Sequence, residues 1–192
     1  MRSIVNGIDT ARWNPETDPA LAAHYNARIP DARKVNKRAL EQHFGLDKDD
    51  GPLFLMVSRL SRQKGTDVIC EVLDFLVGNG ARLAILGSGD AETQLCELAH
   101  ECVPEMNRTG SLADTVIDAN PAVPGVGAAT GVQFDGAHYH GLAAAFSRAI
   151  ALYRQPDHWQ QIQRNGVAAD FSWRRSGAQY AAIYQQLAGA NP

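Results

Sequence analysis

The order of apolar and polar segments predicts an α/β fold class with a parallel sheet at its centre. Residues 53–57 and 83–86 are short, continuous apolar runs, as in strands that are buried on both faces of a parallel sheet. Between them, residues 66–77 place apolar side chains at helical spacing. Strand, helix and strand in this order are the repeating unit of a parallel sheet with crossover helices.

Further helices are expected on both sides of this unit, but few further strands. Residues 31–44 are predicted to form a helix that starts at Asp31, a residue suited to the N-cap, and stops at Gly45. A complete doubly wound sheet usually has more strands, whereas only residues 131–134 offer another short one. The sheet is therefore expected to be incomplete. The other predicted helices cover residues 91–102, 139–154, 157–169 and 174–188.

The composition fits a globular protein of one domain or two small ones. The chain of 192 residues is 45% hydrophobic and 20% charged, with a formal net charge of -3. This charge argues against a general nucleic-acid binder. Cysteines without CxxC spacing indicate reduced thiols. Because no apolar run could span a bilayer and no signal-peptide pattern is seen, we expect a cytoplasmic protein with neither a membrane nor a nucleic acid as partner.

Two candidate cations, Arg59 and Lys64, lie in the loop that follows the first predicted strand, Ser58-Arg59-Leu60-Ser61-Arg62-Gln63-Lys64-Gly65. α/β folds bind ligands at the carboxyl ends of their strands, and a helix N-terminus attracts anions. Arg59 can donate two parallel hydrogen bonds to a phosphate, Lys64 adds a compact charge, and Gly65 permits a close backbone approach. The loop indicates a diphosphate site; the alternative is a pair of solvated surface cations.

Two other turns are weaker candidates. Gly87, Ser88 and Gly89 follow the second predicted strand and leave room for a ribose or base at the same edge of the sheet. An ordinary strand-to-helix turn explains them equally well. Thr109 and Gly110 lie in a later turn whose backbone N–H groups can face an anion.

The remaining candidate residues are expected to have structural roles rather than catalytic or metal-binding ones. His138 and His140 have no Cys or carboxylate cluster to support them, so we expect solvent-exposed side chains and no metal site. No Ser/His/Asp or Cys/His arrangement can be assembled, and no cofactor is expected. The aromatic residues at helical spacing are expected in the core rather than at a sugar: Trp159, Trp173, Tyr180 and Tyr184.

Several segments, taken in order, resemble bacterial glycogen (starch) synthases, retaining glucosyltransferases with two Rossmann-like domains facing a cleft, the GT-B type. The resemblance covers nearly the whole chain, and the combination is highly specific. The matching segments are Val5-Asn6-Gly7-Ile8-Asp9, Trp13-Asn14-Pro15-Glu16-Thr17-Asp18, Asn36-Lys37-Arg38, Val57-Ser58-Arg59-Leu60-Ser61-Arg62-Gln63-Lys64-Gly65, Leu86-Gly87-Ser88-Gly89-Asp90, Arg108-Thr109-Gly110-Ser111-Leu112-Ala113-Asp114-Thr115-Val116, Ala129-Thr130-Gly131-Val132-Gln133-Phe134 and Asp170-Phe171-Ser172-Trp173.

The resemblance implies a role for each candidate. As catalytic residues, Arg59 and Lys64 would hold the diphosphate of ADP-glucose and stabilise charge on the departing ADP. The residues expected to border the nucleotide or its phosphates are Gly87, Ser88, Gly89, Thr109 and Gly110. The family transfers glucose from ADP-glucose to the non-reducing end of an α-1,4-glucan in glycogen biosynthesis. ADP-glucose or ADP, and an α-glucan acceptor, are therefore the expected partners.

The chain also departs from the family. The N-terminal domain is expected to be absent, because the sequence starts near the domain junction. An internal gap before Arg108, on the order of 50 residues, removes the Glu-Pro-Cys-Gly-Leu motif whose Glu contacts the donor sugar. Ser111 stands where the family's Thr-Gly-Gly has its second Gly. We therefore expect the isolated chain to be inactive, because it lacks orienting and transition-state contacts.

The alternative is a non-catalytic module derived from that domain, which binds an adenine nucleotide, a glucan or a partner protein. The incomplete sheet would offer it a surface for self-association. In either case we expect an interdomain segment with one helix, residues 1–50, and a truncated Rossmann-like nucleotide-sugar-binding domain with C-terminal helices, residues 51–192.

The last predicted helix is a special case. In the family the C-terminal helix crosses onto the N-terminal domain. Without that domain, Trp173, Tyr180 and Tyr184 must pack elsewhere or stay exposed, so the helix is expected to be mobile or repacked.

Overall fold

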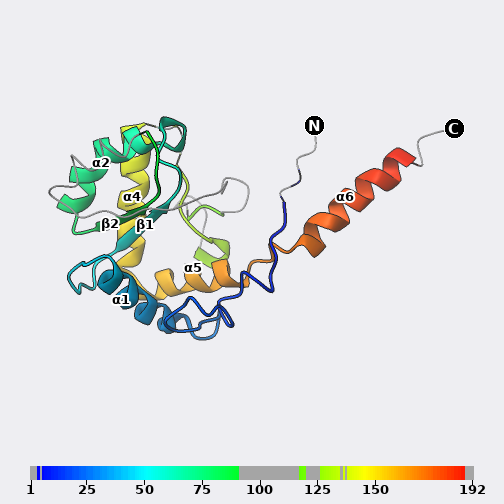
Figure 1. Ribbon diagram of the computed structural model, residues 1–192, viewed down its shortest axis with the longest axis horizontal. Helices are drawn as coiled ribbons and strands as arrows, with labels where there is room; N and C mark the ends of the chain where they lie inside the picture. Colours follow the sequence, from blue (N-terminus) through cyan, green and yellow to red (C-terminus); the bar gives the residue numbers. More distant parts are fainter. Residues whose placement is uncertain are drawn as a thin grey trace.

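The computed structural model describes residue 4 and residues 6–90, 117–119, 126–134, 136 and 138–188. Helices surround a small parallel sheet, and the C-terminal helix extends away from this body (Figure 1). Strands β1 (Leu53–Val57) and β2 (Arg82–Leu86) pair in parallel, with Val57 opposite Leu86. Helix α2 (Thr66–Gly78) connects them. The predicted strand, helix and strand are thus confirmed, and the described residues contain one two-stranded sheet.

The core lies between one face of this sheet and two helices, α2 and α4 (Tyr139–Tyr153). Leu76 of α2 and Ile150 of α4 are buried together, and Phe54 of β1 and Leu83 of β2 pack against them. The ring of Phe54 meets Phe146 edge to face, with 4.8 Å between centroids. Burial of these apolar side chains supplies most of the stabilising free energy of the unit.

The other face of the sheet differs from the prediction. Leu55, in the middle of β1, is 48% exposed, so the expectation that β1 is buried on both faces is wrong. A continuous apolar run lacks the alternation that would mark an exposed face. For this reason the sequence could not show which strand residues stay open.

Helix α1 (Arg33–His43) follows a 3-10 turn, η1 (Pro30–Ala32). Its predicted end is confirmed, because Gly45 adopts a φ of 62° just beyond the last turn. The predicted N-cap is wrong: Asp31 lies inside the 3-10 turn, where it pairs with Lys34 at 2.9 Å. Because the 3-10 turn occupies residues 30–32, the α-helix starts at Arg33, and Asp31 is not in the capping position.

A second short turn, η3 (Val126–Ala128), lies against helix α5 (Pro156–Ala168). The strand predicted at residues 131–134 is reduced to a single parallel bridge between Gly131 and Asp118. Side chains hold this region instead: Asp118 accepts from the Gln133 N–H at 2.6 Å and from Arg148 of α4 at 3.0 Å. The expectation of a strand is therefore wrong, since side-chain contacts replace a ladder there.

Helix α6 (Trp173–Ala188) leaves the body and points into solvent (Figure 1). Trp173, Tyr180 and Tyr184 are 50%, 37% and 69% exposed, so the expectation that they belong to the core is wrong. They stay exposed, as expected if their usual cover is absent. Trp159 is half-buried on α5 and meets the ring of Tyr153 edge to face.

The base of α6 is fixed by the N-terminal segment. The Ile8 N–H donates to the Phe171 carbonyl at 2.8 Å, and Ile8 forms a parallel bridge with Ser172. A Cβ at Gly7 would lie 2.8 Å from the Ser172 carbonyl carbon, so only glycine fits beside this turn. The helix predicted at residues 91–102 lies outside the described residues. Among the helices that the structure describes, none has the length and apolar character needed to cross a bilayer.

Candidate functional site

The pairing of the two strands continues into the loops that follow them. The Ser58 N–H donates to the Leu86 carbonyl at 3.3 Å, and the Leu60 N–H donates to the Ser88 carbonyl at 3.0 Å. These bonds bring together two segments that the sequence singled out separately. The Arg59 loop and the Gly87-Ser88-Gly89 turn therefore lie side by side at the carboxyl edge of the sheet, where α/β folds bind ligands.

Hydrogen bonds fix the Arg59 carbonyl and the backbone of both neighbouring residues. Its neighbours Ser58 and Leu60 both donate to the β2 side, and its own carbonyl accepts from the Ser61 N–H at 3.1 Å and the Ser58 hydroxyl at 3.2 Å. Leu60 itself is fully buried. The loop thus has a rigid base from which the Arg59 side chain projects.

Lys64 and Gly65 form the entrance to α2. Lys64 ends a short 3-10 turn, η2 (Arg62–Lys64), and Gly65 adopts a φ of 73° as the N-cap of α2. No side chain caps this end of α2. The Val68 N–H donates to the Asp67 carboxylate at 3.0 Å, whereas no described bond takes up the N–H groups of Thr66 and Asp67. These two N–H groups and the positive end of the helix dipole are therefore available to an anion.

Two other polar residues lie at this helix start, Arg62 and Thr66. Arg62 pairs with Asp67 of α2 at 3.1 Å, so it is neutralised locally. Thr66 is fully buried, and its Oγ1 has no hydrogen-bond partner among the described residues. Sequence reasoning gave no role to Thr66 or Leu60; the signal for Leu60 was its position as the one apolar residue in a polar loop.

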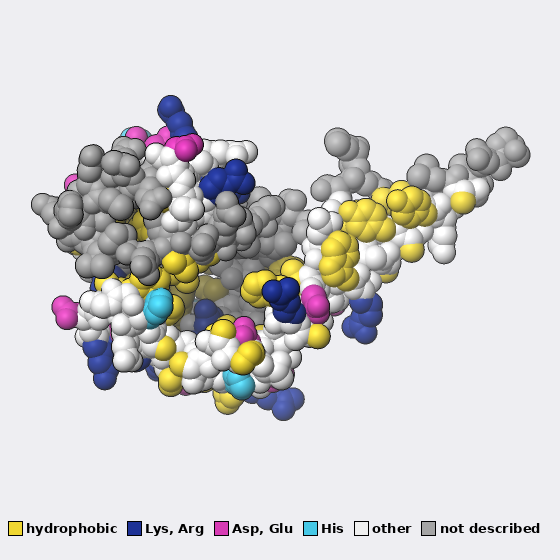
Figure 2. Space-filling model, in the orientation of Figure 1, with side chains coloured by type: hydrophobic (Ala, Val, Ile, Leu, Met, Phe, Trp, Pro, Cys, Tyr) yellow, Lys and Arg dark blue, Asp and Glu magenta, His cyan; other side chains and the backbone are white. Residues whose placement is uncertain are grey.

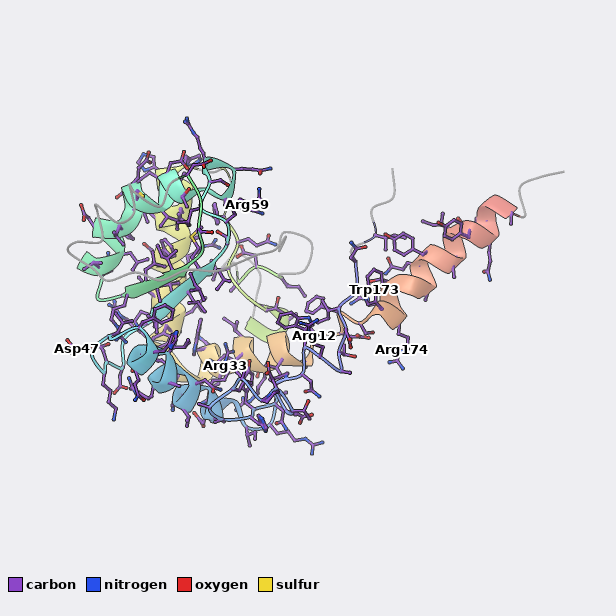
Figure 3. The ribbon with its side chains drawn as sticks, in the orientation of Figure 1. Arg12, Arg33, Asp47, Arg59, Trp173 and Arg174 are labelled. Atoms are coloured by element: carbon purple, nitrogen blue, oxygen red, sulfur yellow. The ribbon has the colours of Figure 1, made fainter. Side chains whose placement is uncertain are left out.

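The two predicted cations are open to solvent. Arg59 and Lys64 are both exposed, and no described carboxylate pairs with either. Figure 3 shows Arg59 on the loop after β1, at the opposite end of the sheet from Asp47. Unpaired cations beside an uncapped helix N-terminus produce a positive region suited to a phosphate group. Thr109, Gly110 and Ser111 lie outside the described residues.

The opposite end of the sheet carries a buried carboxylate. Glu41 of α1 is 2% exposed and accepts from Arg38 at 2.6 Å and from Arg82 of β2 at 2.5 Å. Burial alone raises the pKa of Glu41, but the hydrogen bonds from Arg38 and Arg82 outweigh it and lower that pKa to about 2. This cluster fixes α1 to the start of β2.

The same end is closed by a second set of contacts. Lys37 donates to the Gly51 carbonyl and to the Tyr153 hydroxyl, which lies 3.1 Å away. Tyr153 donates in turn to the Asp50 carbonyl at 2.8 Å. Asn36 binds both backbone groups of Ala23. The segment Asn36-Lys37-Arg38 therefore holds loops together, and its conspicuous charges belong to the fold rather than to a ligand site.

His138 and His140 have separate structural contacts. His138 Nδ1 accepts from the Gly141 N–H at 3.1 Å and caps α4, whereas the ring of His140 meets Tyr139 edge to face. Both are exposed, as expected. In the part of the chain that the structure describes, no group of His, Cys, Asp and Glu side chains is arranged to hold a metal ion.

Comparison with known proteins confirms the resemblance to glycogen synthases, although no model of a protein family matches the chain. A glycogen synthase from Novosphingobium aromaticivorans is 47% identical over 96% of this chain and 48% of its own length. A glycogen synthase from Rhizobium rhizogenes is 38% identical over 97% of the chain and 49% of its own. The chain thus spans about half the length of the curated relatives it matches.

The alignment also supports the internal gap. It runs over 232 residues with the Novosphingobium relative, whereas this chain has 192, so at least 40 aligned positions have no residue here. The Glu-Pro-Cys-Gly-Leu motif does not occur in the sequence. The chain therefore contains the Arg59 loop and the Gly87-Ser88-Gly89 turn, but it lacks an internal part of the region that aligns in the relative.

A solved structure shows the same fold. The catalytic domain of starch synthase IV from Arabidopsis thaliana, solved with bound ADP and acarbose, matches with a TM-score of 0.81 at 23% identity. The match covers 95% of this chain and 48% of that one. This confirms the expected fold class, an incomplete Rossmann-like, GT-B-type sheet with flanking helices and a helical C-terminus. Over nearly its whole length the chain is therefore similar to glycogen synthases, and it matches about half of their length.

Proposed function

We propose that this chain carries the ADP-glucose-binding half-site of a glycogen synthase. The observation that supports it most directly is the joined pair of loops at the carboxyl edge of the sheet. Leu60 is bonded to Ser88 there, and Arg59 projects from the junction with no described partner. The similarity to glycogen synthases and the ADP bound to the starch synthase structure favour a nucleotide over other anions.

In this proposal the diphosphate lies between Arg59, Lys64 and the N-terminus of α2. Arg59 donates paired hydrogen bonds to phosphate oxygens, and Lys64 supplies a second positive charge. The N–H groups of Thr66 and Asp67, at the start of α2, complete the anion site. The same charges would stabilise ADP as it leaves the glucose, which is a transition-state contribution when the rest of the cleft is present.

Calorimetric titration of ADP into the wild-type chain tests the half-site. Arg59→Ala and Lys64→Ala should each weaken binding about ten- to a hundredfold, since each removes a charge-assisted hydrogen bond. Arg174→Ala is the matched control, because Arg174 is exposed on α6 far from this edge (Figure 3). Equal binding by all these variants would contradict the proposal.

Catalysis by the isolated chain is not part of the proposal. A glucan acceptor and the donor sugar need contacts from elements that this chain lacks, among them the Glu of the missing motif. We expect no transfer of labelled glucose from ADP-glucose to glycogen above background. Transfer that follows the concentration of the purified chain would overturn this expectation.

A second candidate function, a partner-binding module, is favoured by α6. Its exposed aromatic residues Trp173, Tyr180 and Tyr184 form an apolar strip that Figure 2 shows along the projecting helix. Such surfaces usually mark protein contacts. Light scattering coupled to size-exclusion chromatography separates the cases: a discrete oligomer that Tyr184→Ser disrupts supports the module, whereas a monomer at all concentrations contradicts self-association.

A further inference from the structure

Gly89 occupies a place in the site that no other residue could fill. A Cβ added at Gly89 would lie 2.9 Å from the Leu60 carbonyl carbon and 3.1 Å from the Leu60 nitrogen, and closer still to the Leu60 oxygen. These are backbone atoms, which cannot move aside as a flexible side chain would. Gly89 also adopts a φ of 154°, which side-chain-bearing residues rarely adopt.

The contact acts directly on the Arg59 loop. Leu60 is the next residue after Arg59, and its N–H donates to the Ser88 carbonyl at 3.0 Å, one residue before Gly89. A side chain at Gly89 would push the two loops apart at the point where this bond joins them. The fully buried side chain of Leu60 would have to shift as well.

We infer that Gly89 is a positioning residue that sets the place of Arg59 by letting the two loops meet. This inference rests on the proposed half-site, in which Arg59 binds the diphosphate. Gly89 needs no contact with the nucleotide in this role, because it acts through Leu60. The reason for a glycine at this position is then the close approach of the two loops, rather than free space for a ribose.

Gly80 offers a matched control. It has a φ of 74°, so alanine there also strains the backbone, but nothing lies within 4 Å of an added Cβ. It follows α2, at the end of the sheet away from Arg59. Gly80→Ala therefore shows whether backbone strain outside the two loops is enough to weaken ADP binding.

The experiment combines ADP titration with amide exchange measured by NMR. Gly89→Ala should weaken ADP binding about as much as Arg59→Ala does, roughly tenfold or more, and Gly80→Ala should bind as the wild type does. The double variant Gly89→Ala/Arg59→Ala should bind ADP no more weakly than Arg59→Ala alone, because both changes remove the same interaction of Arg59 with the diphosphate. Additive losses, or normal ADP binding by Gly89→Ala, would overturn the inference.

Amide exchange keeps the inference testable by itself. In the wild-type chain the Leu60 amide should be protected although it lies beyond β1, and Gly89→Ala should remove this protection while Gly80→Ala keeps it. A Leu60 amide that exchanges freely in the wild type would refute the contact even if Gly89→Ala does not fold. If the wild type fails to bind ADP but shows this pattern of protection, the proposed function fails and the loop contact stands.

Discussion

The two ends of the small sheet use charge in opposite ways. At the end where the strands begin, which we call the closed end, Lys37, Arg38, Glu41 and Arg82 all have partners. At the end where the strands finish, the open end, Arg59 and Lys64 are exposed without a described carboxylate partner. The paired charges of the closed end stabilise the fold, whereas the exposed charges of the open end are the ones that the proposed diphosphate site would use.

The comparison also shows why sequence alone misjudges charged motifs. Asn36-Lys37-Arg38 and Arg59 are equally conspicuous in the sequence, yet the first holds loops and the second faces solvent. What separates them is the set of partners that Asn36-Lys37-Arg38 finds in the fold, among them Gly51 and Tyr153, which are far away in the sequence. Four predictions test this difference, from the largest expected effect to the smallest.

The closed end should be sensitive to loss of its carboxylate. Glu41→Gln leaves Arg38 and Arg82 without their shared counter-charge, and breaking such a buried pair costs about 3 kcal/mol or more. Urea unfolding at neutral pH measures the loss of free energy. Glu71→Gln, which changes an exposed carboxylate on α2, is the control and should stay within about 0.5 kcal/mol of the wild type. A similar small change for Glu41→Gln would mean that the cluster does not hold α1.

Acid should weaken the closed end through the same group. The pKa of Glu41 is lowered from 4.5 to about 2 in the folded chain, so the unfolded chain binds its proton at a higher pH. The contribution of Glu41 is complete above pH 4.5 and is lost as the pH falls toward 2. It is on the order of 3 kcal/mol. Unfolding free energies measured across this range should fall more steeply for the wild type than for Glu41→Gln; parallel curves would contradict the assignment.

A half-exposed charge pair should give an intermediate effect. Asp118 and Arg148 are partly buried, and Asp118 also accepts from the Gln133 N–H. Burial raises the pKa of Asp118, but these hydrogen bonds outweigh it and keep that pKa below its usual value. Asp118→Asn keeps the shape and should cost about 1 kcal/mol in thermal or urea unfolding. No loss at all would show that the bridge between Gly131 and Asp118 is held by its backbone alone.

The open end should tolerate loss of its cations. Arg59→Ala and Lys64→Ala should change the free energy of unfolding by less than about 0.5 kcal/mol, because neither side chain has a described partner to lose. The same urea titrations that test Glu41 provide the measurement. A large destabilisation by Arg59→Ala would mean that Arg59 stabilises the fold as the charges of the closed end do. The two ends of the sheet would then not differ in their use of charge.

The sequence was sufficient for features that depend on local chemistry. The bounds of β1, α2 and α4 follow from apolar spacing and, for α2, from the glycines on either side of it, so their prediction was nearly correct. Parallel strands also place their following loops at one edge, which is why Arg59 and Gly87 could be assigned to one site before the structure was known.

Features that depend on distant partners could not be predicted. The contact of Gly89 with Leu60 needs the register of β1 and β2, and the cluster of Glu41 with Arg82 needs the position of α1 against the sheet. The exposure of α6 could not be predicted from its own pattern, since its apolar face is that of an ordinary packed helix. Asp31 failed as an N-cap because a 3-10 turn took its place.

The most direct test of the account is to map ADP binding on the labelled chain by NMR. We predict saturable shifts in the amides of residues 58–68 and 87–89, at the open end, and none in residues 37–50 at the closed end. At an ADP concentration that half-saturates the wild type, Arg59→Ala should remove most of these shifts while leaving the rest of the spectrum unchanged. Shifts centred on the closed end or on α6, or no shifts at saturating ADP, would contradict the claim that the carboxyl edge of this sheet is a nucleotide site.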